Sequence, residues 1–180
     1  MSRVQGIAVV FLAVLPAACR QPARTSVATT GTATAVMRSA QGATLGTLRF
    51  NATGAGVRVA GTLAGLPPGV HGIHFHQVGR CYAPDFATAG GHLNPTGALH
   101  GLQNPLGPHA GDLPNLTVAA NGEGEIETVA RGVTLRGTNP LLKPGGTALV
   151  IHASADDNRT DPAGNSGVRI ACGVIRESSE

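Results

Sequence analysis

Glycine and proline interrupt this chain at short intervals along its whole length, and that spacing limits what it can fold into. The 180 residues include 26 glycines and 12 prolines. Both residue types disfavour the interior of a helix, and no strongly periodic helical stretch lies between them. Short apolar segments bounded by turn residues are typical of strands. The chain is therefore predicted to be an all-β domain of short strands joined by many turns.

Segments with strand character follow one another through most of the chain. They cover residues 35–38, 43–50, 57–63, 70–78, 115–119, 125–130, 147–152 and 168–175. Asn121-Gly122 lies between two of them and is a strong signal for a tight hairpin turn. About eight strands of this kind predict a β-sandwich or β-barrel. Two longer connections, residues 79–112 and 153–167, are the expected functional loops, because long loops in a compact domain are usually functional or disordered.

The N-terminal residues have the pattern of an export signal. Arg3 precedes an apolar run over residues 7–15 and a small-residue exit at residues 16–18. The run is too short to span a bilayer, which takes about 20 apolar residues. An exported chain meets an oxidising compartment, where Cys81 and Cys172 would pair. The alternative is that both remain buried thiols.

The export signal also predicts how the chain is divided into segments. Residues 15–19 resemble a bacterial lipoprotein lipobox, except that proline lies where leucine is usual. Two outcomes stay open, a lipidated Cys19 or plain cleavage nearby. We expect a signal peptide over residues 1–18, a lipidated cysteine and flexible tether over residues 19–32, and the folded domain over residues 33–177. The expected location is the bacterial cell envelope, either free in the periplasm or anchored to a membrane only through Cys19.

Histidine is concentrated in a chain that shows little other chemistry. Imidazole is the commonest metal ligand among side chains. Six imidazoles exceed what one four-coordinate ion needs, so two metal ions are the first hypothesis. The alternative is a scatter of surface imidazoles. Six of the seven histidines belong to the cluster, together with Asp112, and these are His74, His76, His92, His100, His109 and His152.

Alternation along residues 71–76 indicates which histidines point the same way. Successive side chains of a strand point to opposite faces. Ile73 and Phe75 should face the core, so His74 and His76 should point outward together and chelate one ion. His71 has the parity of Ile73, and we expect it to be buried with backbone hydrogen bonds.

The same alternation puts His152 on the outward face of its strand, so the site should lie outside the β-layer, under the two long loops. Zinc prefers four tetrahedral ligands, and three histidines with Asp112 would complete such a site. Copper(II) suits imidazole nitrogen. His74, His76 and His152 would leave copper one nitrogen short, so either one histidine is shared between the ions or copper has three.

Several motifs in order along the chain resemble those of the Cu,Zn superoxide dismutases. The resemblance covers nearly all of residues 33–175, and runs of this length are highly specific. It implies an eight-stranded Greek-key β-barrel with two long functional loops. The matching segments are Gly-Ile-His-Phe-His at 72–76, Gly-His-Leu-Asn-Pro at 91–95, His-Gly at 100–101, His-Ala-Gly-Asp-Leu at 109–113, Val-Ile-His at 150–152 and Gly-Asn-Ser-Gly-Val-Arg-Ile-Ala-Cys-Gly-Val-Ile at 164–175.

The resemblance also implies a role for each polar residue of these motifs. His92 would be the imidazole shared by both ions, and Asp156 would link two ligands from outside. Arg169 would stand beside copper and attract the anion. By this resemblance copper is held by His74, His76, His92 and His152. Zinc is held by His92, His100, His109 and Asp112, Asp156 links His74 to His100, and Cys81 is paired with Cys172.

The implied activity is dismutation of superoxide to oxygen and hydrogen peroxide at the copper ion, with Arg169 and His92 as the catalytic residues. Two departures from the family pattern concern the substrate channel: Ala163 replaces a frequent threonine, and Arg159 is the one cation that the 153–167 loop adds. We expect a wider channel and weaker steering.

Two other function classes compete with this one. An envelope copper or zinc carrier with the same fold would have little turnover and no need of Arg169. A hydrolase would need an open zinc position or a nucleophile elbow, and neither is indicated. The formal charge of +3 comes without a basic stripe, so nucleic acid is not an expected partner. No oligomeric state is predicted.

Overall fold

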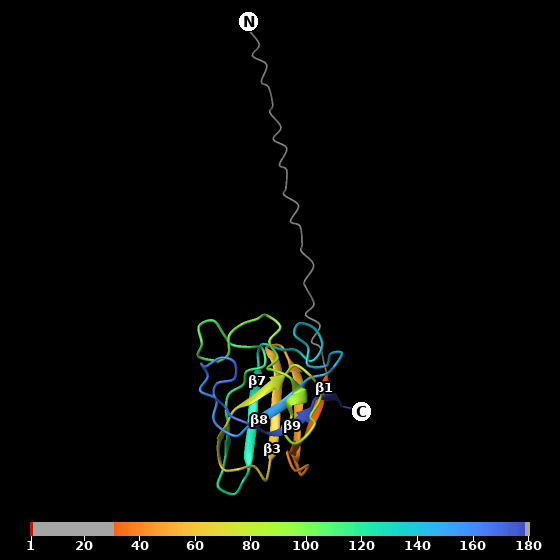
Figure 1. Cartoon of the computed structure of the whole chain (residues 1–180). Helices are drawn as coiled ribbons and strands as arrows, with labels where there is room; N and C mark the ends of the chain where they lie inside the picture. Colours follow the sequence, from red (N-terminus) through yellow and green to blue (C-terminus); the bar gives the residue numbers. More distant parts are fainter. Residues whose placement is uncertain (2–30, 179–180) are drawn as a thin grey trace.

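A computed structural model describes Met1 and residues 31–178 (Figure 1). The expected signal peptide after Met1, Cys19 and nearly all of the expected tether lie outside the described residues. Within the described part, no helix is long and apolar enough to cross a bilayer.

The described chain is all-β, as predicted, with one short 3₁₀ turn, η1 (Ala87–Ala89). Each long strand alternates buried and exposed side chains, which is the pattern of a sheet with one face on the core. The strands are β1 (Thr32–Ser39), β2 (Thr44–Thr53), β3 (Gly56–Leu63), β4 (Gly69–His71), β5 (Ile73–His76), β6 (Leu116–Val118), β7 (Gly124–Ala130), β8 (Ala148–His152), β9 (Arg169–Val174) and β10 (Arg176–Glu177).

The strand order almost closes the sheet into a barrel. Neighbours run β4-β6-β7-β3-β2-β1-β9-β8-β5, and β10 pairs with β1. β4 and β5 follow each other in the chain but stand at opposite ends of this order, so the two edges meet where the chain passes between them. All the strand pairs are antiparallel. β3 pairs with the distant β7, as expected for the long return connection of a Greek key.

The strand expected over residues 70–78 is instead two short strands, because the chain changes partners at Gly72. β4 pairs with β6, and β5 pairs with β8. At the change, the Gly72 N–H donates to the Ser154 carbonyl, and the His152 N–H donates to the Gly72 carbonyl. A Cβ at residue 72 would lie only 2.8 Å from the Ser166 Cβ. Glycine therefore lets the 153–167 loop pack directly on the seam of the barrel.

The core fills the barrel as the alternation predicted. Ile73 and Phe75 of β5 and Leu149 and Ile151 of β8 are fully buried in one large cluster. The opposite face of β8 contributes to a second, smaller cluster with the β9 residue Cys172. Both faces of β5 and β8 are buried, because the long loops cover the outer one.

Two local expectations are confirmed. The β6–β7 hairpin turns at Asn121-Gly122, where Gly122 adopts a φ of 80° that favours glycine. A disulfide joins Cys81 to Cys172 with a Cα–Cα distance of 5.7 Å. It ties the loop between β5 and β6 to β9, and this loop contains three of the six clustered histidines and Asp112.

Candidate metal centre

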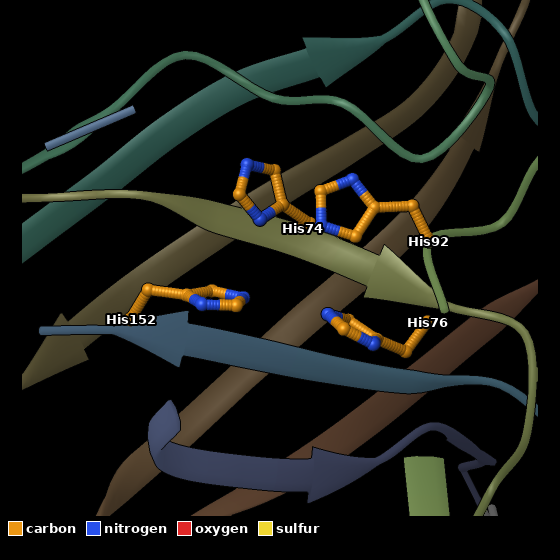
Figure 2. A group of neighbouring side chains, drawn as sticks. All are labelled: His74, His76, His92 and His152. Atoms are coloured by element: carbon orange, nitrogen blue, oxygen red, sulfur yellow. The ribbon is translucent and has the colours of Figure 1, made fainter. Parts of the chain in front are cut away.

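The structure brings all six histidines and Asp112 together in two groups that share His92. Within each group the possible ligand atoms lie within 4.8 Å of one another, and every member is buried. Figure 2 shows the rings of the first group turned toward a common space. The first group is His74, His76, His92 and His152, and the second is His92, His100, His109 and Asp112.

Strand pairing positions three members of the first group. His74 and His76 lie on the outer face of β5, and His152 ends the neighbouring strand β8. His92 comes from the loop and is held against β5 by a short antiparallel bridge to His76. The Leu93 N–H donates to the Phe75 carbonyl at 2.8 Å, which fixes the loop beside the strand.

The first group leaves four ring nitrogens without any hydrogen-bond partner among the described residues. Buried polar atoms almost always have partners, so four together in one pocket point to a missing ligand. Nitrogen donors without a carboxylate suit copper. The residues therefore fit a copper ion, and the atoms that would hold it are His74 Nδ1, His76 Nε2, His92 Nε2 and His152 Nε2.

Burial keeps the strand histidines of this group neutral. It lowers the pKa of His74 to about 4, of His152 to about 3 and of His76 to about 2, against an ordinary value of 6.5. A neutral imidazole offers a lone pair, whereas a protonated one repels a cation. At neutral pH these three rings are therefore ready to bind a metal.

The second group is built around one carboxylate oxygen. Asp112 Oδ1 lies 3.0 Å from His92 Nδ1, 3.1 Å from His100 Nδ1 and 3.3 Å from His109 Nδ1. Ligands about 2.0–2.1 Å from a tetrahedral zinc ion stand roughly 3.3 Å apart, so the set fits zinc. The other oxygen, Oδ2, accepts the N–H groups of Gly101 and His109, each at 2.9 Å. Burial alone would raise the pKa of Asp112, but hydrogen bonds from His100 and His92 outweigh it and lower that pKa.

Asp156 joins the two groups from outside. Its Oδ2 accepts from His74 Nε2 at 2.7 Å, and its Oδ1 accepts from His100 Nε2 at 3.0 Å. The Asn115 side chain bonds both the N–H and the carbonyl of Asp156, which holds the residue in place. Burial opposes the charge on His100, but hydrogen bonds to Asp112 and Asp156 prevail and raise the His100 pKa to about 9.

Backbone carbonyls orient the remaining rings of the first group. His76 Nδ1 donates to the Gly90 carbonyl at 2.8 Å, and His152 Nδ1 donates to the Gly167 carbonyl at 3.0 Å. These bonds place the proton on Nδ1 and leave Nε2 as the free donor atom. A ligating histidine commonly has its second nitrogen satisfied in this way.

His71 is buried against the backbone, as expected. Its Nδ1 lies 2.8 Å from the His152 carbonyl oxygen, and its Nε2 lies 2.8 Å from the Pro67 carbonyl oxygen. The ring therefore bridges β8 and the turn that precedes β4, across the seam of the barrel.

A cavity of about 350 Å³ opens onto His92, the residue that the two groups share. Arg169 stands in its wall, and its guanidinium donates to the Phe86 carbonyl at 2.6 Å and the Gly90 carbonyl at 2.7 Å. Because Gly90 also holds His76, the cation is fixed relative to the first group. Arg159, by contrast, bonds Gln103 and is not part of this wall. The lining residues are His76, Gly91, His92, Asn94, Ala98, His109, His152, Asp161, Pro162, Ala163 and Arg169.

Sequence reasoning missed Asp161, which also lines this cavity. Its Oδ1 accepts the His100 N–H at 2.8 Å and lies 3.7 Å from His109 Nε2. Nothing in the pattern of the 153–167 loop distinguishes Asp161 from Asp157, so the sequence held no signal for it.

Comparison with known proteins agrees with this geometry. The profile of the family described as copper/zinc superoxide dismutase (SODC) matches residues 44–175. A superoxide dismutase [Cu-Zn] of Aquifex aeolicus is 47% identical over 139 residues, which cover 76% of this chain and 81% of that protein. One from Caulobacter vibrioides is 40% identical over 148 residues, which cover 80% of this chain and 85% of that protein.

Solved structures show the same fold. The crystal structure of a superoxide dismutase-like protein from Bacillus subtilis matches with a TM-score of 0.76 at 36% identity, and the match covers 78% of this chain and 96% of that one. The clock protein EA4 matches with a TM-score of 0.70 at 35% identity, over 82% of this chain and 94% of that one.

Proposed function

The chain belongs to the copper/zinc superoxide dismutase family and dismutates superoxide with copper and zinc as cofactors, and we propose how its own residues divide that work. The assignment rests on one observation above all. Four buried ring nitrogens converge without partners on one side of His92, and a carboxylate-centred group stands on its other side.

The first group is assigned to copper and the second to zinc. The first offers only imidazole nitrogen, whereas the second offers three nitrogens and a carboxylate oxygen, a set that completes a closed zinc site. His92 serves both, because its Nε2 faces the first group and its Nδ1 faces Asp112. Copper is held by His74, His76, His92 and His152, and zinc by His92, His100, His109 and Asp112.

Bound copper supplies the one-electron redox chemistry, and zinc, which is redox-inert, supplies only charge and position. One superoxide is oxidised to oxygen, and a second is reduced and leaves as hydrogen peroxide after gaining two protons. His92 Nε2 lies beside the substrate cavity and could hold one of those protons whenever it is not bound to copper. On the far side of the ring, His92 Nδ1 faces the second group and would be held there as one of the zinc ligands.

Arg169 draws the anionic substrate into the cavity. Burial lowers the pKa of its guanidinium, which nevertheless remains protonated at neutral pH because the ordinary value is so high. Its two carbonyl anchors leave it fixed at the wall near His76 and His152. Burial keeps the neighbouring His76 and His152 rings neutral in the metal-free chain, so Arg169 supplies the positive charge beside them in this wall.

Paired ligand variants test the division of the metals. His152→Ala should abolish superoxide consumption and copper retention while zinc stays near one ion per chain. His109→Ala should lose zinc and keep copper. Metal analysis of both variants and the unmodified protein, with a superoxide-consumption assay, measures all of this. Zinc loss in His152→Ala, or stoichiometric copper without turnover in the unmodified protein, would overturn the proposal, and the latter would favour a copper carrier.

The proposal extends to where the protein works. We assign residues 1–18 to an export signal and Cys19 to a lipid anchor in the bacterial cell envelope. Support comes from the apolar run before Cys19 and from the Cys81–Cys172 disulfide, since disulfides persist in oxidising compartments. Intact mass of the mature chain should show acyl groups, and Cys19→Ala should release the protein from membranes. A mature chain that begins after Cys19 would refute the anchor.

A further inference from the structure

Almost every histidine assigned to a single ion has an outer hydrogen-bond partner for its second ring nitrogen. His74 and His100 use Asp156, and His76 and His152 use backbone carbonyls. His109 is the exception. Its Nδ1 faces Asp112, and the carboxylate of Asp161 faces its Nε2 at 3.7 Å.

A hydrogen bond holds the Asp161 side chain in that position. Its Oδ1 accepts the backbone N–H of His100 at 2.8 Å. The same oxygen atom is therefore bonded to one zinc-side histidine and faces the ring of another. Its side chain is 46% exposed, whereas that of Asp156 is 1% exposed, so its contribution should be the weaker of the two.

The surrounding loop contacts explain why Asp161 stays there. The Gln103 N–H donates to the Asn158 carbonyl at 3.0 Å, and Asn104 Nδ2 donates to the Arg159 carbonyl at 3.2 Å. A Cβ at Gly101 would lie 2.2 Å from the Asn158 carbonyl oxygen. The 153–167 loop is thus pressed onto the loop that holds His100 and His109.

We propose that Asp161 is a positioning residue of the zinc-side group. Through one carboxylate oxygen, Asp161 orients the His109 ring and the His100 backbone, and it thereby slows zinc release. The inference rests on the zinc ligand set proposed above. Outer partners of metal-bound histidines typically affect metal affinity by 10–100-fold, and a half-exposed carboxylate belongs at the lower end of that range.

The test is the rate of zinc release to a chromophoric chelator, with copper kept in place. Asp161→Ala should raise the release rate about tenfold. Asp161→Asn keeps an oxygen that can accept the His100 N–H but loses the charge facing His109, so its release rate should fall between those of Asp161→Ala and the unmodified protein.

Asp157→Asn is the matched control. Asp157 lies in the same loop and accepts from the N–H groups of Arg159 and Thr160 and from Asn165, with no bond to a zinc-side histidine. Its change should loosen the loop and leave zinc release unaltered. If Asp157→Asn releases zinc as fast as Asp161→Ala, general loop packing accounts for the effect and the proposal is overturned.

A spectroscopic measurement separates positioning from stability. In the zinc-loaded protein, the His109 Nε2–H proton resonance should shift and exchange faster with water in Asp161→Ala, while the His100 Nε2–H, bonded to Asp156, should not change. Equal changes in both signals would contradict the assignment.

His109→Ala tells the two proposals apart. Fast zinc loss in His109→Ala together with unaltered loss in Asp161→Ala would remove Asp161 from the site and leave the ligand set standing. Unaltered zinc retention in His109→Ala would overturn the ligand set and the role of Asp161 with it.

Discussion

The two halves of the metal centre share one histidine but are assembled from different parts of the fold. Three of the proposed copper ligands lie on the paired strands β5 and β8, and hydrogen bonds from their other ring nitrogens to Asp156 or to backbone carbonyls hold the rings in place. All four proposed zinc ligands come from the loop between β5 and β6. The copper side is therefore part of the barrel wall, whereas the geometry of the zinc side depends on the contacts that hold this loop against the barrel.

The difference extends to charge. On the copper side, burial keeps His74, His76 and His152 neutral, and each ring of the first group has one nitrogen without a hydrogen-bond partner among the described residues. The zinc side contains the buried carboxylate of Asp112, which is already bonded to its neighbours. The strand-held half is therefore preorganised, but four of its ring nitrogens need an ion as a partner. In the loop-held half, the polar groups already hydrogen-bond one another through Asp112, but the loop is less firmly anchored to the barrel.

Removal of the disulfide should produce the largest difference between the halves. The bond spans a sequence separation of 91 residues, for which loop-closure entropy predicts a loss of about 4–5 kcal/mol in the free energy of unfolding. Urea unfolding of the Cys81→Ala, Cys172→Ala double variant measures it. Zinc should also dissociate faster than copper, because Cys81 anchors the loop. Equal acceleration for both metals would contradict the distinction.

Asp156→Asn should weaken both halves together, since this carboxylate bonds one ring of each. We expect a 10–100-fold loss of affinity for copper and for zinc, measured by competition with chelators. A loss confined to one metal would show that Asp156 serves that half alone.

Acid should destabilise the metal-free protein. The folded-state pKa values of about 4, 3 and 2 for His74, His152 and His76 lie below the ordinary 6.5, so the unfolded chain binds more protons below that pH. Stability should fall as pH drops from about 6.5 towards 4, by up to about 1.4 kcal/mol per pH unit for each ring.

The contribution of His100 to stability changes with pH in the opposite direction. The pKa of His100 is raised to about 9 in the folded chain. Its contribution to folding stability is therefore fully present below pH 6.5 and is lost as the pH rises towards 9. Urea midpoints of chelator-treated protein between pH 5 and pH 9 test both slopes, with the metal-loaded protein as the control. A midpoint that rises on acidification below pH 6 would contradict the burial of neutral rings on the copper side.

Arg169→Ala should have the smallest effect, because this residue belongs to neither half. Both metals should remain bound, while superoxide consumption should slow severalfold to about tenfold, the low end of electrostatic steering. Its dependence on ionic strength should also flatten. Stopped-flow rates at two salt concentrations test this, and an unchanged salt dependence would remove Arg169 from substrate attraction.

The same two halves differ in how far they could be predicted. Strand alternation alone placed His74, His76 and His152 on one outer face, because a strand has a fixed period of two. His92, His100 and His109 lie in irregular backbone whose path is set by contacts far apart in the sequence. Their density in the sequence predicted a metal site, but only the resemblance of their motifs to a known family indicated which of them would share each ion.

The details that escaped prediction have the same cause. The break at Gly72 arises from an exchange of strand partners, and residue periodicity does not report partners. Asp161 acquires its place from the packing of one loop on another. Local propensity contains no information about either.

On the copper side, four imidazole nitrogens have no hydrogen-bond partner among the described residues, so we expect the metal-free chain to bind trace transition-metal ions. Along the divalent first-row series, affinity peaks at copper, and that preference extends to sites with mixed oxygen and nitrogen donors. We therefore expect copper that is added first, or leached from resins and buffers, to bind in the second group as well as in the first. Reconstitution in the laboratory has to begin with zinc, and a polyhistidine tag would compete with the barrel for the ion added second.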